Sequence, residues 1–364
     1  MSSTPPTDDL PDPDHLPRPE MPGKAVPRML APSRILRETE GRAGGWRERE
    51  ELVEDAREMI ARGSKSFYIA SRLFDRATRE KAWLLYAWCR RCDDLADGQD
   101  LGGNLVDPPE NQEEAENRLQ AIRVLTRRAF ERQPTADPAF DGLGQLAMET
   151  GITEEMAEDV IAGFALDAAE WRPRTEADLL RYCYHVAGAV GVMMARVMGV
   201  PGDDGETLDR ACDQGIAFQL ANIARDLAQD ADLGRCYIPQ EWLAEEDIEP
   251  GQEMKPHHRG EMADIAKRLV ALMERYEAAA RWGTRTLPFR SRWAVLAAAN
   301  IYGAIGREVA ARGPSAWDER VVIPRWEQLK LIVRAWRDAL DNKPARPSEP
   351  ILWSRHDFRP LAGW

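Results

Sequence analysis

The sequence is poor in cysteine and has no apolar run long enough to cross a bilayer. Its five cysteines are an odd number scattered over 364 residues, which favours reduced thiols in a cytoplasmic protein. The longest apolar stretch, 186–200, is interrupted by Arg196 and contains three glycines, so no transmembrane helix is expected. The first residues lack the apolar core of a signal peptide, which argues against export.

The sequence has fewer basic than acidic residues, and it lacks the alternating pattern of β-strands. Lys and Arg total 49 against 62 Asp and Glu, a net charge of −13, so a nucleic-acid partner is not expected. No run alternates apolar and polar residues long enough to predict a β-strand. No glycine-rich phosphate loop follows a strand, and Gly142-Leu143-Gly144 does not have the spacing of a dinucleotide fingerprint.

Helical periodicity occupies most of the chain after Trp46. It predicts helices at 47–62, 66–74, 78–97, 113–132, 153–165, 176–199, 205–231, 261–284, 291–311 and 324–341. The pattern is typical of an all-α domain, here 45–347, whose helices pack around a central space. Residues 1–44, rich in Pro, Asp and Ser, are predicted to be a disordered tail, and 348–364 a C-terminal tail.

Two acidic clusters lie on separate predicted helices. In the second, residues three or four positions apart form one polar stripe about 16 Å long: Gln219, Asn222, Asp226 and Asp230. An aliphatic stripe about 100° away supplies the packing surface, so the polar stripe must face a cavity or solvent. In the first, the same spacing places four residues on one face: Tyr86, Arg90, Asp93 and Asp97.

Both acidic clusters lie near predicted helix C-termini, before Gly98 and Gly234. Carbonyl ends disfavour carboxylates by about 0.3–1 kcal/mol each, and stacked like charges add a similar penalty. Bound divalent cations would reverse the sign, and Mg²⁺ typically takes one or two carboxylates together with phosphate oxygens and water. The pattern therefore predicts a metal–diphosphate site; the alternative is two solvated acidic faces.

A diphosphate also needs fixed hydrogen-bond donors. Arg225 and Arg90 suit that role because guanidinium groups donate two parallel hydrogen bonds to phosphate, although Arg90 could instead pair with Asp93 or Asp94. The segment 64–67 either caps a helix or presents hydroxyl and N–H groups to phosphate. Small residues in 182–191 allow a helix kink or the close approach of a ligand.

Taken together, these motifs resemble the squalene/phytoene synthase family, and within it bacterial carotenoid-pathway enzymes, over about Glu50 to Pro347. They are Gly63-Ser64-Lys65-Ser66-Phe67, Leu85 to Arg90 leading into Asp93 to Asp97, Tyr182 to Gly191, and Gln219 to Asp230 continuing through Gly234 to Pro239. Gly63 stands where some relatives carry histidine, so any role of that histidine is missing here.

The resemblance implies an isoprenoid synthase fold in which the two acidic helices face each other across a hydrophobic cavity. It implies Mg²⁺ or Mn²⁺ held by Asp93, Asp97, Asn222, Asp226 and Asp230, with Arg225 and Tyr182 also catalytic. It places further residues at the substrate: Ser64, Ser66, Phe67, Tyr86, Arg90, Gln219, Tyr302 and Arg320.

The expected reaction joins two geranylgeranyl diphosphates head to head through prephytoene diphosphate, giving 15-cis-phytoene. Tyr182 or released diphosphate would accept the proton, and NADPH is not expected. Candidate apolar walls are Phe67, Val190, Met193, Met194 and Phe218, each of which could instead be ordinary core. Long lipid substrates and products predict a cytoplasmic enzyme loosely associated with membranes, with possible contacts to neighbouring carotenoid-pathway enzymes.

Three other functions fit parts of the sequence. The same chemistry on farnesyl diphosphate would give squalene or dehydrosqualene, and cavity depth decides between C15 and C20 chains. A non-catalytic relative acting as an assembly factor would usually have lost acids from one or both motifs, whereas here all are present. A structural helical protein with solvated acidic faces would bind no diphosphate.

Overall fold

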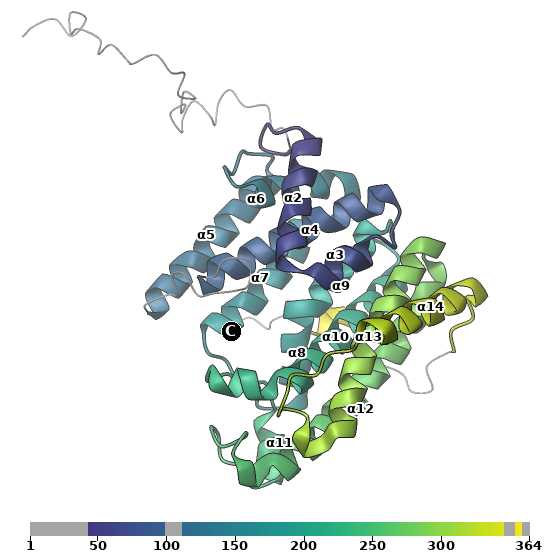
Figure 1. Ribbon diagram of the computed structural model, residues 1–364. Coiled ribbons are helices and arrows are strands. Elements are labelled where there is room, and N and C mark those ends of the chain that lie inside the picture. Colours follow the sequence, from purple (N-terminus) through teal and green to yellow (C-terminus); the bar gives the residue numbers. More distant parts are fainter. Residues whose placement is uncertain (1–42, 99–110, 346–353, 359–364) are drawn as a thin grey trace, which may run out of the picture. The chain divides into compact units, whose positions relative to one another are not determined.

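Helix dominates the part of the chain that the computed structural model describes, residues 43–98, 111–345 and 354–358 without the side chains of Lys65 and Ser66 (Figure 1). The α-helices are α2 (Arg49–Gly63), α3 (Lys65–Ser71), α4 (Arg76–Asp97), α5 (Gln112–Phe130), α6 (Pro138–Thr150), α7 (Glu154–Ala168), α8 (Glu176–Cys183), α9 (Ala189–Val197), α10 (Gly205–Asp232), α11 (Gln240–Glu245), α12 (Arg259–Gly283), α13 (Phe289–Arg312) and α14 (Arg325–Asp341). Shorter helical turns are η2 (Tyr184–Gly188), η3 (Pro256–His258), η4 (Thr284–Thr286), η5 (Gly313–Ser315) and η6 (Arg355–Phe358). The all-α prediction is confirmed.

Periodicity missed two helices, α6 and α11. Helix α6 contains Gly142 and Gly144, which weaken any helical prediction because glycine lowers helix propensity. A Cβ on Gly144 would lie 2.7 Å from the carbonyl oxygen of Ala129 in α5. The glycine is therefore needed where two helix backbones approach closely, a tertiary requirement that local propensity does not reveal. Helix α11 is six residues long, too short to establish a period.

The predicted helix at 176–199 is divided into α8, η2 and α9. Element η2 is a π-helical turn over Tyr184–Gly188, which interrupts the regular α-helix within the small-residue segment. The glycines of this region lie against α10. A Cβ on Gly191 would lie 2.3 Å from the carbonyl oxygen of Ala211, and one on Gly215 would lie 2.2 Å from that of Ala187. Only glycine permits this crossing of the two backbones.

Helix α10 is surrounded by packed elements. It contacts α9, η2, α12 and α13, and its aliphatic residues Leu220 and Ile223 are buried in the core. Its first turn is capped by Asp204, whose carboxylate accepts a hydrogen bond from the Thr207 N–H at 3.1 Å. This packing fixes the rotation of α10 about its own axis, and so the direction of its polar stripe.

Helix α4 carries the other acidic motif and has defined ends. Asp75 caps its first turn by accepting from the Thr78 N–H at 3.0 Å. Gly98, predicted to stop the helix, has a left-handed φ of 65° that favours glycine. Trp83 and Trp88 are buried beneath the helix, which leaves its acidic face free of core contacts.

The tails predicted at the two ends are described only in part. Nearly all of 1–44 lies outside the described residues, as do most of 348–364. In the described segment 354–358, Phe358 is buried and stacks on Tyr184 with ring centroids 5.8 Å apart. Arg355 donates to the Gly205 carbonyl at 3.1 Å. This short segment therefore packs against the helical domain.

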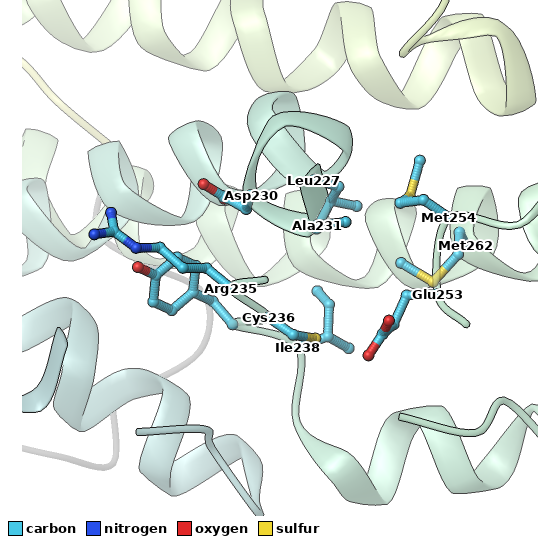
Figure 2. A pocket seen from close by; sticks show the side chains of 10 residues that line it. Leu227, Asp230, Ala231, Arg235, Cys236, Ile238, Glu253, Met254 and Met262 are labelled. Carbon is cyan, nitrogen blue, oxygen red and sulfur yellow. The ribbon is translucent and has the colours of Figure 1, made fainter. Parts of the chain in front are cut away.

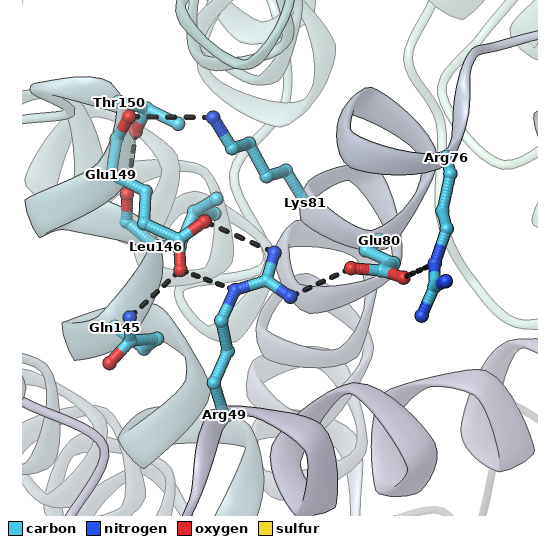
Figure 3. Close-up of polar contacts among 8 residues, drawn as sticks. All are labelled: Arg49, Arg76, Glu80, Lys81, Gln145, Leu146, Glu149 and Thr150. Carbon is cyan, nitrogen blue, oxygen red and sulfur yellow. Dashed lines mark hydrogen bonds and ion pairs between the residues drawn. The ribbon is translucent and has the colours of Figure 1, made fainter.

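An arginine-centred network joins α2, α4 and α6 (Figure 3). The Arg49 guanidinium donates to Glu149 at 2.6 Å and to Glu80 at 2.7 Å. Arg76 also donates to Glu80, and Gln145 to Glu149. Burial alone would raise the pKa of both glutamates, but the bonds from Arg49 and its neighbours outweigh it, and both pKa values are lowered.

We predict that Arg49→Met lowers the free energy of unfolding by about 1–3 kcal/mol at pH 7, because two partly buried carboxylates lose their shared donor. Arg47→Met is the matched control, since Arg47 pairs with Asp55 at an exposed site and should cost less than about 1 kcal/mol. Urea denaturation measures both. The Arg49 effect should shrink as the pH falls through the lowered pKa values of the glutamates; equal losses in the two variants would contradict the network's role.

Candidate active site

The two acidic motifs line one cavity of about 1270 Å³. Helix α4 contributes Asp93 and Asp97, and helix α10 contributes its polar stripe. All of the residues predicted as catalytic lie in this lining: Asp93, Asp97, Tyr182, Asn222, Arg225, Asp226 and Asp230. The motifs are thus not two separate solvated faces. They form opposite parts of one hollow large enough for a bound molecule.

Arginines already contact several of the cavity carboxylates. Arg320 holds Asp226 with two bonds of 3.1 Å, and Arg225 donates to the same carboxylate at 2.8 Å. Arg235, which follows α10, pairs with Asp97 of α4 at 3.5 Å. The last contact links the two motifs directly.

Arg90 forms an ion pair with Asp93, which was the predicted alternative to a role in phosphate binding. It therefore contacts the acidic motif without appearing in the cavity lining. Burial lowers the pKa of Arg90, but Asp93 and Tyr86 outweigh burial and leave it raised. The guanidinium is positively charged at any working pH, and it lies one helical turn from the cavity.

The pKa values of the carboxylates on α10 and α4 are shifted in different directions. Burial and the neighbouring Asp226 raise the pKa of Asp230 to about 7. Burial also raises the pKa of Asp93, with partial compensation from Arg90. At Asp226 burial acts in the same direction, but the bonds from Arg225 and Arg320 outweigh it and lower the pKa. The two arginines that contact Asp226 thus give its pKa the opposite shift to that of Asp93 and Asp230.

The balance of acidic and basic side chains at the cavity shows whether these residues suit a divalent cation. Six carboxylates line the cavity against three arginines: Asp93, Asp97, Asp167, Glu170, Asp226 and Asp230, with Arg172, Arg225 and Arg235. Arg90 and Arg320 also pair with Asp93 and Asp226 from outside the lining. An anionic diphosphate would be repelled unless cations accompanied it. The donor set, carboxylate oxygens plus the Asn222 amide, consists of the oxygen ligands that Mg²⁺ and Mn²⁺ accept. The residues present fit such ions.

Within the described residues, no three His, Cys, Asp or Glu side chains converge closely enough to hold one ion alone. At phosphate-binding sites Mg²⁺ usually takes one or two carboxylates together with phosphate oxygens and water.

Asp167, at the end of α7, is a residue that sequence reasoning missed. Its carboxylate accepts hydrogen bonds from the Tyr182 and Tyr237 hydroxyls, each at 3.0 Å. The two tyrosine rings stack with centroids 4.6 Å apart. Burial raises the pKa of Asp167 to about 6, despite the opposing effect of Tyr237, Arg235 and Tyr182. Burial likewise raises the pKa of Tyr182 well above its usual value.

Two further cavity residues follow the second motif. Arg235 and Tyr237 fall in the Gly234–Pro239 segment, and the continuation of the motif into that segment was the signal that could have identified them. Asp167 and Arg172 stand outside every motif, so only the fold brings them to the cavity.

The predicted substrate-binding residues are distributed unevenly. Gln219 lines the cavity and accepts a 3.5 Å bond from Asn222. Arg320 reaches Asp226 from outside the lining. Ser64 caps α3 by accepting a hydrogen bond from the Phe67 N–H at 3.4 Å. Of the two roles predicted for this segment, helix capping is the one observed. The side chain of Ser66 lies outside the described part of the chain.

Four predicted aromatic residues, Phe67, Tyr86, Phe218 and Tyr302, form two ring pairs and are not part of the cavity lining. Phe67 lies 5.7 Å from Tyr86, and Phe218 stacks on Tyr302 at 4.3 Å, both between ring centroids. None of the candidate wall residues appears in the cavity lining, which has Phe164, Trp171 and Ile223 as apolar members instead. Of these candidates, Met193 is fully buried in the core. Their role as walls stays a prediction.

A second, very small pocket lies behind Asp230. Its volume of about 10 Å³ is close to that of one water molecule. Figure 2 shows Asp230 and Arg235 extending toward one side of this pocket and Met254 and Met262 toward the other.

Comparison with known proteins identifies the family. A family model described as squalene/phytoene synthase matches residues 60–327. The chain belongs to the squalene/phytoene synthase family. It is 44% identical to a phytoene synthase from Pseudescherichia vulneris over 84% of this chain and 98% of that protein. It is 45% identical to a 15-cis-phytoene synthase from Enterobacter agglomerans over 80% of this chain and 98% of that protein.

Solved structures of the squalene/phytoene synthase fold agree with the architecture. A dehydrosqualene synthase in complex with a ligand superposes with a TM-score of 0.71 at 23% identity, covering 82% of this chain and all of that one. Squalene synthase HpnC from Alicyclobacillus acidocaldarius gives 0.64 at 22% identity, covering 74% and 97%. At these identities the likeness establishes the fold alone.

We predict that Asp230→Asn raises the free energy of unfolding of this protein, in the absence of metal ions at pH 8, by about 1–3 kcal/mol. The pKa of Asp230 is about 7 in the folded protein and about 3.9 when unfolded. Its contribution to stability is therefore full below about pH 4 and is lost as the pH rises through about 7. The variant should gain little at pH 5.

Thermal unfolding in EDTA and in Mg²⁺ measures this effect. Mg²⁺ should raise the Tm of the wild type, because a ligand of the folded state stabilises it, and should raise that of Asp230→Asn less. Asp232→Asn, an exposed position on the same helix, should behave like wild type in both media. A Mg²⁺ shift that survives in Asp230→Asn would count against metal binding at that carboxylate.

Proposed function

We propose that this chain is a 15-cis-phytoene synthase that joins two geranylgeranyl diphosphates head to head through prephytoene diphosphate and releases two diphosphates. The observation that carries the proposal is the convergence of both acidic motifs on one cavity. Identity of 44–45% to bacterial phytoene synthases, over 98% of their length, supports the C20 substrate.

The cavity residues divide into those that would bind metal ions and those that would bind the diphosphate groups of the substrate. Asp93, Asp97, Asn222, Asp226 and Asp230 would hold Mg²⁺ or Mn²⁺. When bound, such ions neutralise diphosphate oxygens and make diphosphate a better leaving group. Arginines at the rim then meet phosphate oxygens that the ions leave uncovered.

The geometry favours one route for the protons lost. Tyr182 has a raised pKa, so its phenol stays protonated and cannot simply accept a proton. Its hydroxyl instead donates to Asp167. A proton leaving the carbon skeleton would be taken by the Tyr182 oxygen while the phenolic proton passes to Asp167. This step conserves charge and needs no hydride donor, so NADPH is not required.

The rival reaction uses farnesyl diphosphate. Its support is the likeness of fold to dehydrosqualene and squalene synthases, which is weaker than the sequence identity to phytoene synthases. A non-catalytic assembly role has no supporting observation, because both acidic motifs are intact and Asp93, Asp97, Asp226 and Asp230 line the cavity.

We infer a cytoplasmic location with peripheral membrane association, and possible contacts with neighbouring carotenoid-pathway enzymes. The support is the chemistry of the substrate and product, which are long prenyl lipids. Among the described residues, none of the helices combines the length and apolarity needed to traverse a bilayer.

Purified enzyme with Mg²⁺ and no NADPH should convert geranylgeranyl diphosphate to 15-cis-phytoene. Its kcat/KM should exceed that for farnesyl diphosphate by at least about tenfold, since each missing methylene costs contact energy. Chromatography of the hydrocarbon products measures both reactions. Asp226→Ala is the negative control. Dehydrosqualene or squalene as the main product would refute the proposal.

The proton route predicts a pH dependence. The kcat/KM of the wild type should fall as the pH drops through about 6, because Asp167 must be ionised to accept a proton. Asp167→Asn should lower kcat by about 10²–10⁴, and Tyr182→Phe by a similar factor. Glu170→Gln, at an exposed carboxylate of the same cavity, should retain activity. Full activity in Asp167→Asn would exclude this route.

A further inference from the structure

Helix α14 exposes a stripe of large apolar side chains to solvent. The stripe consists of Trp326, Leu329, Val333, Trp336 and Leu340, whose exposed fractions are 60%, 61%, 43%, 42% and 57%. The spacing of three, four, three and four residues places all of them on one helical face. A monomeric soluble protein seldom leaves so continuous an apolar surface without a partner.

The orientation of this stripe is fixed by α13, beside which α14 lies (Figure 1). Three side chains of α13 donate to backbone carbonyls of α14. Trp293 donates to Ile332 at 3.0 Å, Asn300 to Leu331 at 3.0 Å, and Arg292 to Ala339 at 2.9 Å. These bonds hold α14 at both its middle and its end, so it cannot roll to bury the stripe.

The face of α14 that packs inward is built from small residues. Ala335 and Ala339 are fully buried and share a small apolar cluster with Leu296 and Ala297 of α13. Alanine lets the two helices approach closely. The helix thus uses its smallest apolar residues for internal packing and directs its tryptophans and leucines outward. Internal stability does not explain that distribution, because burying the larger side chains would gain more.

Basic residues border the exposed stripe. At 100° per residue, Lys330 and Arg337 fall within about 40° of one edge and Arg325 lies about 20° beyond the other, while Arg334 lies about 80° from the stripe. All of them are exposed. The Lys330 ammonium lies 4.2 Å from the centre of the Trp326 ring. The acidic Asp341 lies about 60° from the same edge as Lys330, and Glu327 and Asp338 lie farther round. In a chain of net charge −13, α14 carries four basic residues against three acidic ones, and the charged side chains nearest the stripe are Arg337, Arg325 and Lys330.

We propose that α14 is a docking helix that lies in the surface of an anionic lipid bilayer. An apolar face containing tryptophan with basic residues along its borders is the pattern of helices that bind the membrane interface. Tryptophan favours the headgroup level, and lysine and arginine meet anionic headgroups. A second copy of this chain is the weaker alternative, since two such stripes would bring their basic borders together. The proposal does not depend on the reaction assigned above.

Vesicle flotation with the full chain tests this docking surface. The vesicles are phosphatidylcholine alone, and phosphatidylcholine with phosphatidylglycerol at about 3:1. The wild type should bind the anionic vesicles and bind neutral ones more weakly. Leu329→Gln/Val333→Gln/Leu340→Gln should reduce binding to anionic vesicles by at least about tenfold, because the inserted apolar area is lost. Lys330→Gln/Arg334→Gln/Arg337→Gln should remove the preference for anionic vesicles, by about fivefold per charge.

Val124→Gln/Met148→Gln is the matched control, since both residues are exposed apolar positions on other helices, and should leave binding unchanged. Tm values near that of the wild type establish folding. Turnover of detergent-dispersed substrate should persist in every variant, which separates this test from that of the reaction. Unchanged binding in the apolar variant would overturn the proposal. So would a wild type that ignores vesicles, or a wild-type dimer that becomes monomeric only in the apolar variant.

Discussion

The crossing of α10 with η2 and α9 determines the geometry of the cavity. At Gly191 and Gly215 the backbones meet at distances that no Cβ could occupy. A helix held at such a crossing cannot rotate or slide without a steric clash, since packed interiors are nearly incompressible. The polar stripe of α10 therefore keeps one direction, toward the cavity that it shares with α4. Backbone contact of this kind positions a polar face more firmly than side-chain packing would.

That rigidity makes an unfavourable arrangement of charge possible. Carboxylates near the C-terminal ends of two helices, with few compensating cations, raise the free energy of the folded state. This cost is accompanied by raised pKa values of Asp93 and Asp230, which are caused first by burial and then by a neighbouring aspartate. Such a cost is typical of functional sites, where residues are selected for binding rather than for stability. The surrounding core, with tryptophan beneath α4 and aliphatic residues beneath α10, supplies the stability that the site lacks.

Sequence reasoning predicted what depends on local periodicity. The long helices, the stop at Gly98 and the grouping of Asp226 with Asp230 all follow from residue spacing. It missed α6, because Gly144 serves a contact with α5 that periodicity does not encode. It missed Asp167 for the same reason, since that carboxylate meets Tyr182 and Tyr237 only through the tertiary fold. A contact between two helices cannot be predicted from the residue periodicity of either helix alone.

The bidentate contact between Arg320 and Asp226 has a thermodynamic consequence. Arg320 Nε and its terminal nitrogen each take one of the two carboxylate oxygens. A cation that coordinates Asp226 must displace at least one of these bonds. The apparent affinity of such an ion would therefore be that of a ligand exchange, smaller than its intrinsic affinity for the carboxylate. The displaced guanidinium becomes available to a phosphate oxygen, so metal and diphosphate should bind with positive cooperativity.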